Sequence, residues 1–224
     1  MRSFDEIFAI AAERKGGAAA LEKLLGKRNP PNEIADQPTD RWLSQMTKCI
    51  FQAGFNWQVV ENKWPGFEAA FFGFDPGRCA MLHDEEIERL AKDSRIIRNP
   101  AKIKTVPDNA QFLLDLGREH KSAAEAFAKW PPEEYIDLLE LIKKRGARLG
   151  GNTGQRFLRM MGVESYIFSP DVVARLIAEG VVDKTPSSKR DLRATQEAFN
   201  RWRAESGRGL TQISRVLAYS VGSH

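Results

Sequence analysis

The stretch Arg148–Leu176, RLGGNTGQRFLRMMGVESYIFSPDVVARL, decides how the fold is interpreted. Two glycines, Gly150 and Gly151, precede a basic helix, and the acid Asp171 follows Pro170 some twenty residues later. The first amides of a helix have no partner within it, and glycine lets an anion approach them closely. The pattern therefore predicts a hairpin between two helices that binds a nucleic-acid backbone through residues Gly150, Gly151, Asn152, Thr153 and Gly154. An ordinary glycine turn between two core helices is the alternative.

The charge around this turn supports the same interpretation. The chain has 224 residues and a formal net charge of +4, which is compatible with a polyanionic partner. Within KKRGARLGGNTGQRFLR there is no acid, whereas six bases occur: Lys143, Lys144, Arg145, Arg148, Arg156 and Arg159. The positive charge is thus concentrated beside the glycines.

Apolar residues recur every three to four positions along almost the whole chain, and alternating runs are scarce. This periodicity predicts an all-α protein. The expected helices are Phe4–Arg14, Ala18–Leu25, Asp40–Lys63, Phe67–Phe72, Asp84–Asp93, Ala101–Glu119, Ala123–Ala128, Glu133–Arg145, Thr153–Met161, Pro170–Glu179, Ser188–Ser206 and Leu210–Val221. The segment GKRNPPNEIADQPTD, residues 26–40, is expected to be a linker rich in Pro and Asn.

We expect residues 1–224 to form a single two-lobed helical unit. One lobe would hold the hairpin, over about residues 65–178. The other would combine residues 1–64 with residues 179–224, since the amphipathic helices at both ends of the chain each need a partner.

The composition predicts neither a metal site nor a cofactor. Two cysteines, Cys49 and Cys79, are too few for a four-cysteine site, and His83, His120 and His224 have no ligand-like spacing. We expect both cysteines to be buried thiols. No apolar run reaches the roughly 20 residues of a membrane span. The acids within MRSFDEIFAIAAERKGG argue against a secretory signal, so a cytoplasmic location is expected.

Asp171 has two interpretations. Pro170 favours the first turn of a helix, which places Asp171 beside the positive end of the helix dipole. Most acids in such a position only stabilise the helix. The other interpretation is a catalytic role, which its distance from the hairpin and the resemblance described next imply.

Together, LGGNTG and SPDVVARL resemble the helix–hairpin–helix–Gly/Pro–Asp superfamily of DNA glycosylases. In that superfamily the hairpin binds DNA, and an aspartate after a Gly/Pro loop assists cleavage of the glycosidic bond. Asp171 matches that aspartate. Bifunctional members carry a lysine nucleophile where this chain has Thr153, so the resemblance implies a monofunctional enzyme that uses water. It also implies the superfamily fold, two helical lobes with a cleft between them.

Two further segments resemble the 3-methyladenine DNA glycosylase I family. Residues 51–82 begin with FQAGFNW, similar to the family's QAG-[aromatic or Leu]-[Ser/Asn]-W segment. Residues 93–116, DSRIIRNPAKIKTVPDNAQFLLDL, are similar to its IIRxxxKIxxxxxNA segment. The resemblance departs from the family in three respects. The zinc ligands are missing, Cys49 replaces the base-reading glutamate, and Asp171 is a carboxylate that the family usually lacks.

The resemblance implies a base pocket formed by Cys49, Gln52, Phe55 and Trp57. Trp57 would stack on a base, Phe55 would contribute a wall, and the Gln52 amide would read a purine edge. For the two rings the alternative is core packing, and for Gln52 it is a buried structural hydrogen bond. Arg98 and Lys102 could contact phosphates, or lie on a solvated helix start.

The implied activity is a monofunctional DNA glycosylase that excises alkylated purines such as 3-methyladenine from double-stranded DNA. The alternatives are a DNA-structure-binding protein without catalysis, and a glycosylase for other lesions. We expect a monomer and no membrane partner.

Overall fold

The computed structural model describes residues 1–222, and His224 lies outside the described residues. The described residues form helices and connecting turns with no strand, so the predicted all-α class is confirmed. The helices are α1 Phe4–Arg14, α2 Ala18–Leu25, α3 Pro31–Ala35, α4 Thr39–Gln52, α5 Trp57–Ala70, α6 Pro76–Ala80, α7 Asp84–Leu90, α8 Pro100–Ile103, α9 Thr105–Glu119, α10 Ala123–Ala128, α11 Tyr135–Arg145, α12 Asn152–Met160, α13 Pro170–Ala178, α14 Lys189–Ser206 and α15 Leu210–Tyr219, with 3₁₀ turns at Phe72–Phe74 and Pro132–Glu134.

The predicted helix Asp40–Lys63 is wrong, because the chain turns between α4 and α5. Gly54 adopts a φ of 66°, and the side chain of Asn56 accepts hydrogen bonds from the amides of Gln58 and Val59, so a new helix begins at Trp57. The predicted helix Phe67–Phe72 is also wrong as a separate element, since α5 continues through Pro65 to Ala70.

Two short helices were not expected from the sequence. The segment 26–40, predicted to be a linker, contains α3, and α6 follows the 3₁₀ turn after α5. Both begin at a proline, the residue type that suits the first position of a helix.

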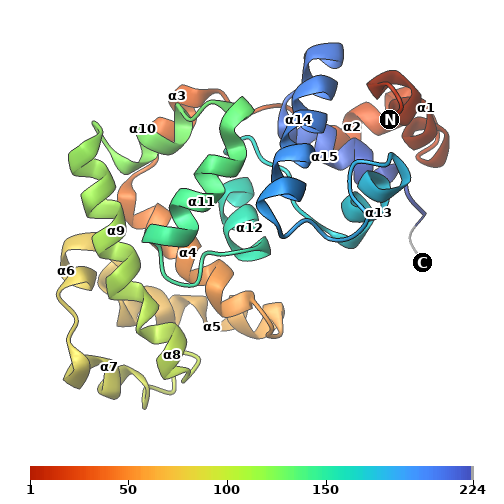
Figure 1. The fold of residues 1–224 in the computed structure, drawn as a ribbon. Helices are drawn as coiled ribbons and strands as arrows, with labels where there is room; N and C mark the ends of the chain where they lie inside the picture. Colours follow the sequence, from red (N-terminus) through yellow and green to blue (C-terminus); the bar gives the residue numbers. More distant parts are fainter. Residues whose placement is uncertain (223–224) are drawn as a thin grey trace. The chain divides into compact units, whose positions relative to one another are not determined.

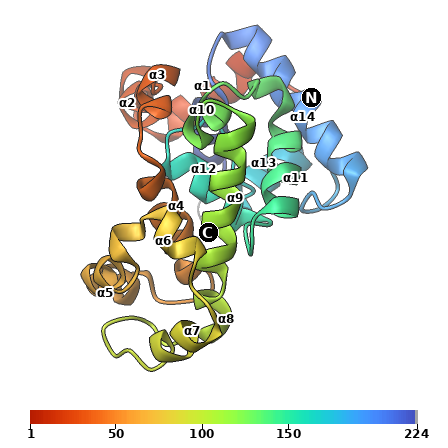
Figure 2. The ribbon, with the colours of Figure 1, turned by 90° about the vertical axis from the view of Figure 1, so that its left-hand side faces the viewer.

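The chain divides into two compact units. Unit 2 consists of Pro30–Trp130 and Leu139–Val163. Helix α4 provides its core, and α9 and α12 pack on α4 (Figure 1). The buried Trp42 stacks on Phe127 at 4.9 Å between ring centroids and meets the edge of Phe157 at 5.8 Å. Helices α8 and α10 lie at opposite ends of α9 (Figure 2).

Unit 1 consists of Met1–Asn29, Pro131–Leu138 and the described residues from Glu164 onward. Helix α15 packs against both α1 and α13. In the core of unit 1, the rings of Tyr166 and Phe199 stack with 4.1 Å between their centroids. The predicted lobe boundaries near residues 64 and 179, and the predicted cleft, stay predictions.

Candidate nucleic-acid interface

The hairpin is built in unit 2 from the end of α11, a short turn and α12 (Figure 1). Leu149 of the turn is 1% exposed. A Cβ on Gly154 would lie 2.2 Å from the Leu149 carbonyl oxygen and 2.6 Å from Ile142 Cδ1. Only glycine at position 154 therefore lets α12 pack so closely against its own turn.

Gly151 is the N-cap residue of α12, with a φ of 58°. Because glycine has no side chain, it cannot cap the amides of the first turn as serine or aspartate would. The helix dipole and the amides of Thr153 and Gly154 then favour an anion at this end of α12. This is the electrostatic arrangement that a phosphate-binding turn requires.

Asn109 of α9 holds the turn in place. Its side chain is fully buried, donates a hydrogen bond to the Ala147 carbonyl oxygen at 3.2 Å and accepts one from the Ala147 amide at 2.8 Å. This role of Asn109 was not expected from the sequence, although Asn109 lies in the segment 93–116. A polar residue on the apolar face of a helix indicates a buried hydrogen bond, and Asn109 occupies such a position in α9, between Val106 and Leu113.

Ion pairing divides five of the six bases around the turn into two groups. Arg145 binds Glu119 through two hydrogen bonds of 2.7 and 2.6 Å, and Lys144 pairs with Glu140 at 2.8 Å. Lys143, Arg148 and Arg156 are exposed and make no ion pair with any described carboxylate. These three side chains leave positive charge available to a polyanion.

Lys102 has a role that the sequence did not suggest. Its ammonium group donates hydrogen bonds to the carbonyl oxygens of Phe51 and Ala53, at 3.2 and 2.7 Å, and so caps the C-terminal end of α4. Burial, followed by the charge of Arg148, lowers the pKa of Lys102. Arg98 is exposed. Phosphate contact by either residue stays a prediction.

The turn between α4 and α5 exposes two aromatic rings. Phe55 is 45% exposed and Trp57 is 49% exposed, so the alternative that these rings pack in the core is wrong. The Arg156 guanidinium lies 4.8 Å from the centroid of the Trp57 ring. This cation–π contact connects the exposed tryptophan to α12, the second helix of the hairpin.

Gln52 and Cys49 lie on the buried side of the same turn. The Gln52 Nε2 atom donates a hydrogen bond of 3.0 Å to Glu61 Oε1. The Cys49 Sγ atom accepts one of 3.4 Å from Gln45. Burial raises the pKa of the Cys49 thiol, against smaller opposing effects of that hydrogen bond and of the charges on Arg156 and Lys48. Cys49 therefore does not supply the negative charge of the glutamate that it replaces.

Asp171 belongs to unit 1, in the first turn of α13. Ser169 is the N-cap residue, and its hydroxyl oxygen accepts a hydrogen bond from the Val172 amide at 3.3 Å. The Asp171 side chain is half-buried and makes no ion pair with a described residue. The helix start expected from SPDVV is thus confirmed, and the catalytic role stays a prediction.

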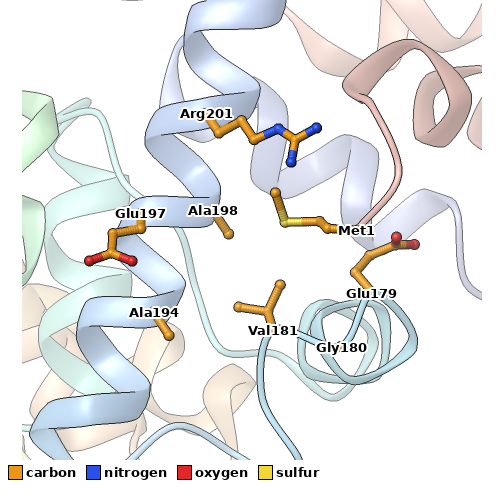
Figure 3. A pocket seen from close by; sticks show the side chains of 8 residues that line it. All are labelled: Met1, Glu179, Gly180, Val181, Ala194, Glu197, Ala198 and Arg201. Carbon is orange, nitrogen blue, oxygen red and sulfur yellow. The ribbon is translucent and has the colours of Figure 1, made fainter.

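A hollow of about 390 Å³ lies in unit 1 and is lined by Met1, Glu179, Gly180, Val181, Ala194, Glu197, Ala198 and Arg201 (Figure 3). None of the residues predicted to form the site lies in it. Among residues 1–222, no group of three or more His, Cys, Asp or Glu side chains is arranged to hold a metal ion. None of the described helices is both long and apolar enough for a membrane span.

The fold is similar to solved structures of DNA glycosylases. A *Methanocaldococcus jannaschii* 8-oxoguanine glycosylase/lyase, solved with a 15mer DNA containing 8-oxoguanine, superposes with a TM-score of 0.55 over 96% of each chain at 15% identity. The 3-methyladenine DNA glycosylase I of *Staphylococcus aureus* matches with a TM-score of 0.51 at 20% identity, over 62% of this chain and 88% of that chain. These similarities show that the chain has the all-helical fold of those glycosylases.

The sequence comparisons find similarity to methyladenine glycosylases. The family model for methyladenine glycosylases matches residues 39–140. DNA-3-methyladenine glycosylase 1 of *Escherichia coli* K12 is 38% identical over 65 residues, which are 29% of this chain and 35% of the relative's own length. The *Haemophilus influenzae* DNA-3-methyladenine glycosylase is 27% identical over 131 residues, 50% of this chain and 71% of that one. The match over residues 39–140, less than half of the chain, confirms the predicted resemblance to the methyladenine glycosylase family.

Proposed function

We propose that this protein is a monofunctional DNA glycosylase that hydrolyses the N-glycosidic bond of alkylated purines such as 3-methyladenine. The observation that carries the proposal is the contact between Trp57 and Arg156. This contact joins the exposed ring of Trp57, which lies in the family-like segment FQAGFNW, to α12, the helix whose first turn favours a phosphate. A damaged base and the neighbouring DNA backbone need those two features side by side.

The hairpin binds the DNA backbone without reading its sequence. Flipping a base out of the duplex costs about a few kcal/mol, less for a damaged base, and stacking on an aromatic ring offsets part of that cost. Since Arg156 lies over one face of Trp57, the base stacks on the other face. Phe55, on the same turn, forms a wall of the pocket.

Cleavage of the bond passes through an oxocarbenium-like state that a carboxylate stabilises. Asp171 supplies this carboxylate and orients the attacking water. An alkylated purine such as 3-methyladenine is already cationic and leaves with little help from a general acid. Thr153 stands where bifunctional relatives have a lysine, so the product is an abasic site in an uncut strand.

A base-release assay tests the proposal. Purified protein is incubated with methylated duplex DNA, and the freed bases are identified by mass spectrometry. Release of 3-methyladenine is expected, and its rate is expected to be insensitive to a chelator. The same assay is run on DNA containing uracil or oxidised bases.

A DNA-binding protein without catalysis is the second candidate, favoured by the neutral Cys49 in place of the family's glutamate. Duplex binding with no release from any of these substrates would overturn the first proposal in favour of the second. If the protein released only another damaged base, the proposal of a glycosylase would stand, but its substrate would be that base and not 3-methyladenine. A monomeric state and a cytoplasmic location stay predictions.

The unpaired bases also predict the salt dependence of duplex binding. Arg148→Gln removes a charge that has no described ion-pair partner, so the slope of log Kd against log salt is expected to fall by about 1. Lys144→Gln is the matched control, since the Lys144 ammonium is paired with Glu140 at 2.8 Å. Fluorescence anisotropy from 50 to 300 mM salt measures both slopes, and equal slopes for Arg148→Gln and wild type would exclude Arg148 from the interface.

A further inference from the structure

Gln52 belongs to a hydrogen-bonded chain of three side chains that joins α4 to α5. Its Nε2 atom donates to Glu61 Oε1 at 3.0 Å, and the other oxygen of Glu61 pairs with Lys48 Nζ at 3.0 Å. Gln52 is 8% exposed, whereas the Glu61 side chain is 47% exposed. Glu61 lies one helical turn after Trp57, on the same side of α5.

The chemistry of these groups fixes which way the Gln52 amide faces. An ionised carboxylate only accepts hydrogen bonds, whereas an amide has one donating and one accepting end. Gln52 must therefore direct its NH₂ group at Glu61, which leaves Oε1 for another partner. No described residue donates to Oε1, and this atom is not among the fully buried polar atoms that lack a partner. The carbonyl oxygen is thus accessible from solvent and ready to accept a hydrogen bond.

We propose that Glu61 is the positioning residue that makes the pocket select adenine-type over guanine-type lesions. By holding the NH₂ end of Gln52, Glu61 presents a carbonyl oxygen to the base. That oxygen accepts from the 6-amino group of an alkylated adenine and opposes the 6-oxo group of an alkylated guanine. The inference rests on the proposed function, because it takes Gln52 as a residue of the base pocket.

The substitution Glu61→Gln tests this role. A glutamine at position 61 can accept or donate, so the Gln52 amide is free to turn over and present its NH₂ group. DNA treated with a methylating agent contains 3-methyladenine and 3-methylguanine, which share the N3 methyl group and differ at position 6 and in the 2-amino group of guanine. Both freed bases are quantified from one reaction. The wild type is expected to prefer 3-methyladenine, and Glu61→Gln is expected to lower that preference about tenfold, the effect of one hydrogen bond.

Three further single variants and one double variant test whether Glu61 positions the Gln52 amide or is merely structural. Lys48→Met removes the other partner of Glu61 but retains the bond to Gln52, so the ratio of the two bases is expected to stay as in wild type. Asn62→Ala, on the next residue of α5, is the surface control. Gln52→Met removes the carbonyl oxygen itself and is expected to lower the preference as Glu61→Gln does. The double variant that combines Gln52→Met with Glu61→Gln is then expected to release the two bases in the same ratio as Gln52→Met alone.

The outcomes distinguish this inference from the function on which it rests. If the wild type releases neither base, the proposed function fails. If the wild type releases 3-methyladenine but Glu61→Gln retains its preference over 3-methylguanine, the proposed function stands and the role of Glu61 is refuted. An additive effect of the two substitutions in the double variant would also refute it, even where the single variants lose stability.

Discussion

Replacement of Asp171 by asparagine is expected to slow the release of 3-methyladenine about 100- to 1,000-fold, because the transition state loses the charge that stabilises its developing cation. The change keeps the size of the side chain. It also keeps the Ser169 cap and Pro170 at the start of α13, so the fold should persist. Single-turnover kinetics on a duplex with one lesion measure the bond-breaking step directly.

Asp5→Asn is the matched control for this prediction. Asp5 is also an acid in the first turn of a helix of unit 1, and it has no place in the proposed mechanism. Its loss should reproduce any cost of removing a dipole-stabilising charge, about 0.3–1 kcal/mol of folding stability, without slowing catalysis. Equal single-turnover rates for Asp171→Asn and Asp5→Asn would remove Asp171 from the mechanism.

Gly154→Ala is expected to have the largest effect on folding. The added Cβ would lie 2.2 Å from the Leu149 carbonyl oxygen, and a backbone atom cannot move aside as the end of a flexible side chain can. Either α12 shifts away from its turn or the turn opens, at a cost of about 3 kcal/mol. Urea unfolding measures this loss. Duplex affinity should fall with it, since the first turn of α12 changes position.

Gly150→Ala provides the comparison within the same turn. A Cβ there would meet only the side chain of Lys143, at 3.6 Å, which is an ordinary contact. The free energy of unfolding should change by less than about 0.5 kcal/mol. If Gly154→Ala proved as stable as Gly150→Ala, the close packing of α12 on its turn would be refuted.

The sequence predicted those features that depend on local signals. Helices α1, α2 and α10 have the expected bounds, and SPDVV begins α13 as expected. The failure at residues 40–63 is also local in origin. Apolar periodicity continues from α4 into α5 and predicts one helix, whereas Gly54 and the capping Asn56 mark a break between two.

The parts of the candidate site that the sequence did not predict depend on contacts between helices. Asn109 binds the turn 38 residues further along the chain, and Lys102 caps a helix that ends 50 residues before it. The exposure of Trp57 followed only from the family resemblance and not from periodicity, because an aromatic residue at a helical position is most often packed in a core. Periodicity indicates which residues face inward, but not which neighbour they meet.

The rings of Phe55 and Trp57 have a consequence for how such a protein changes over time. About half of each residue is exposed, 45% for Phe55 and 49% for Trp57, and together they leave an apolar surface in contact with water. A mutation that replaces them with small polar residues would cost the fold little. Under the proposed function, selection at these two positions therefore acts mainly on lesion recognition. A lineage that no longer needed the proposed repair activity could lose both rings while retaining every helix.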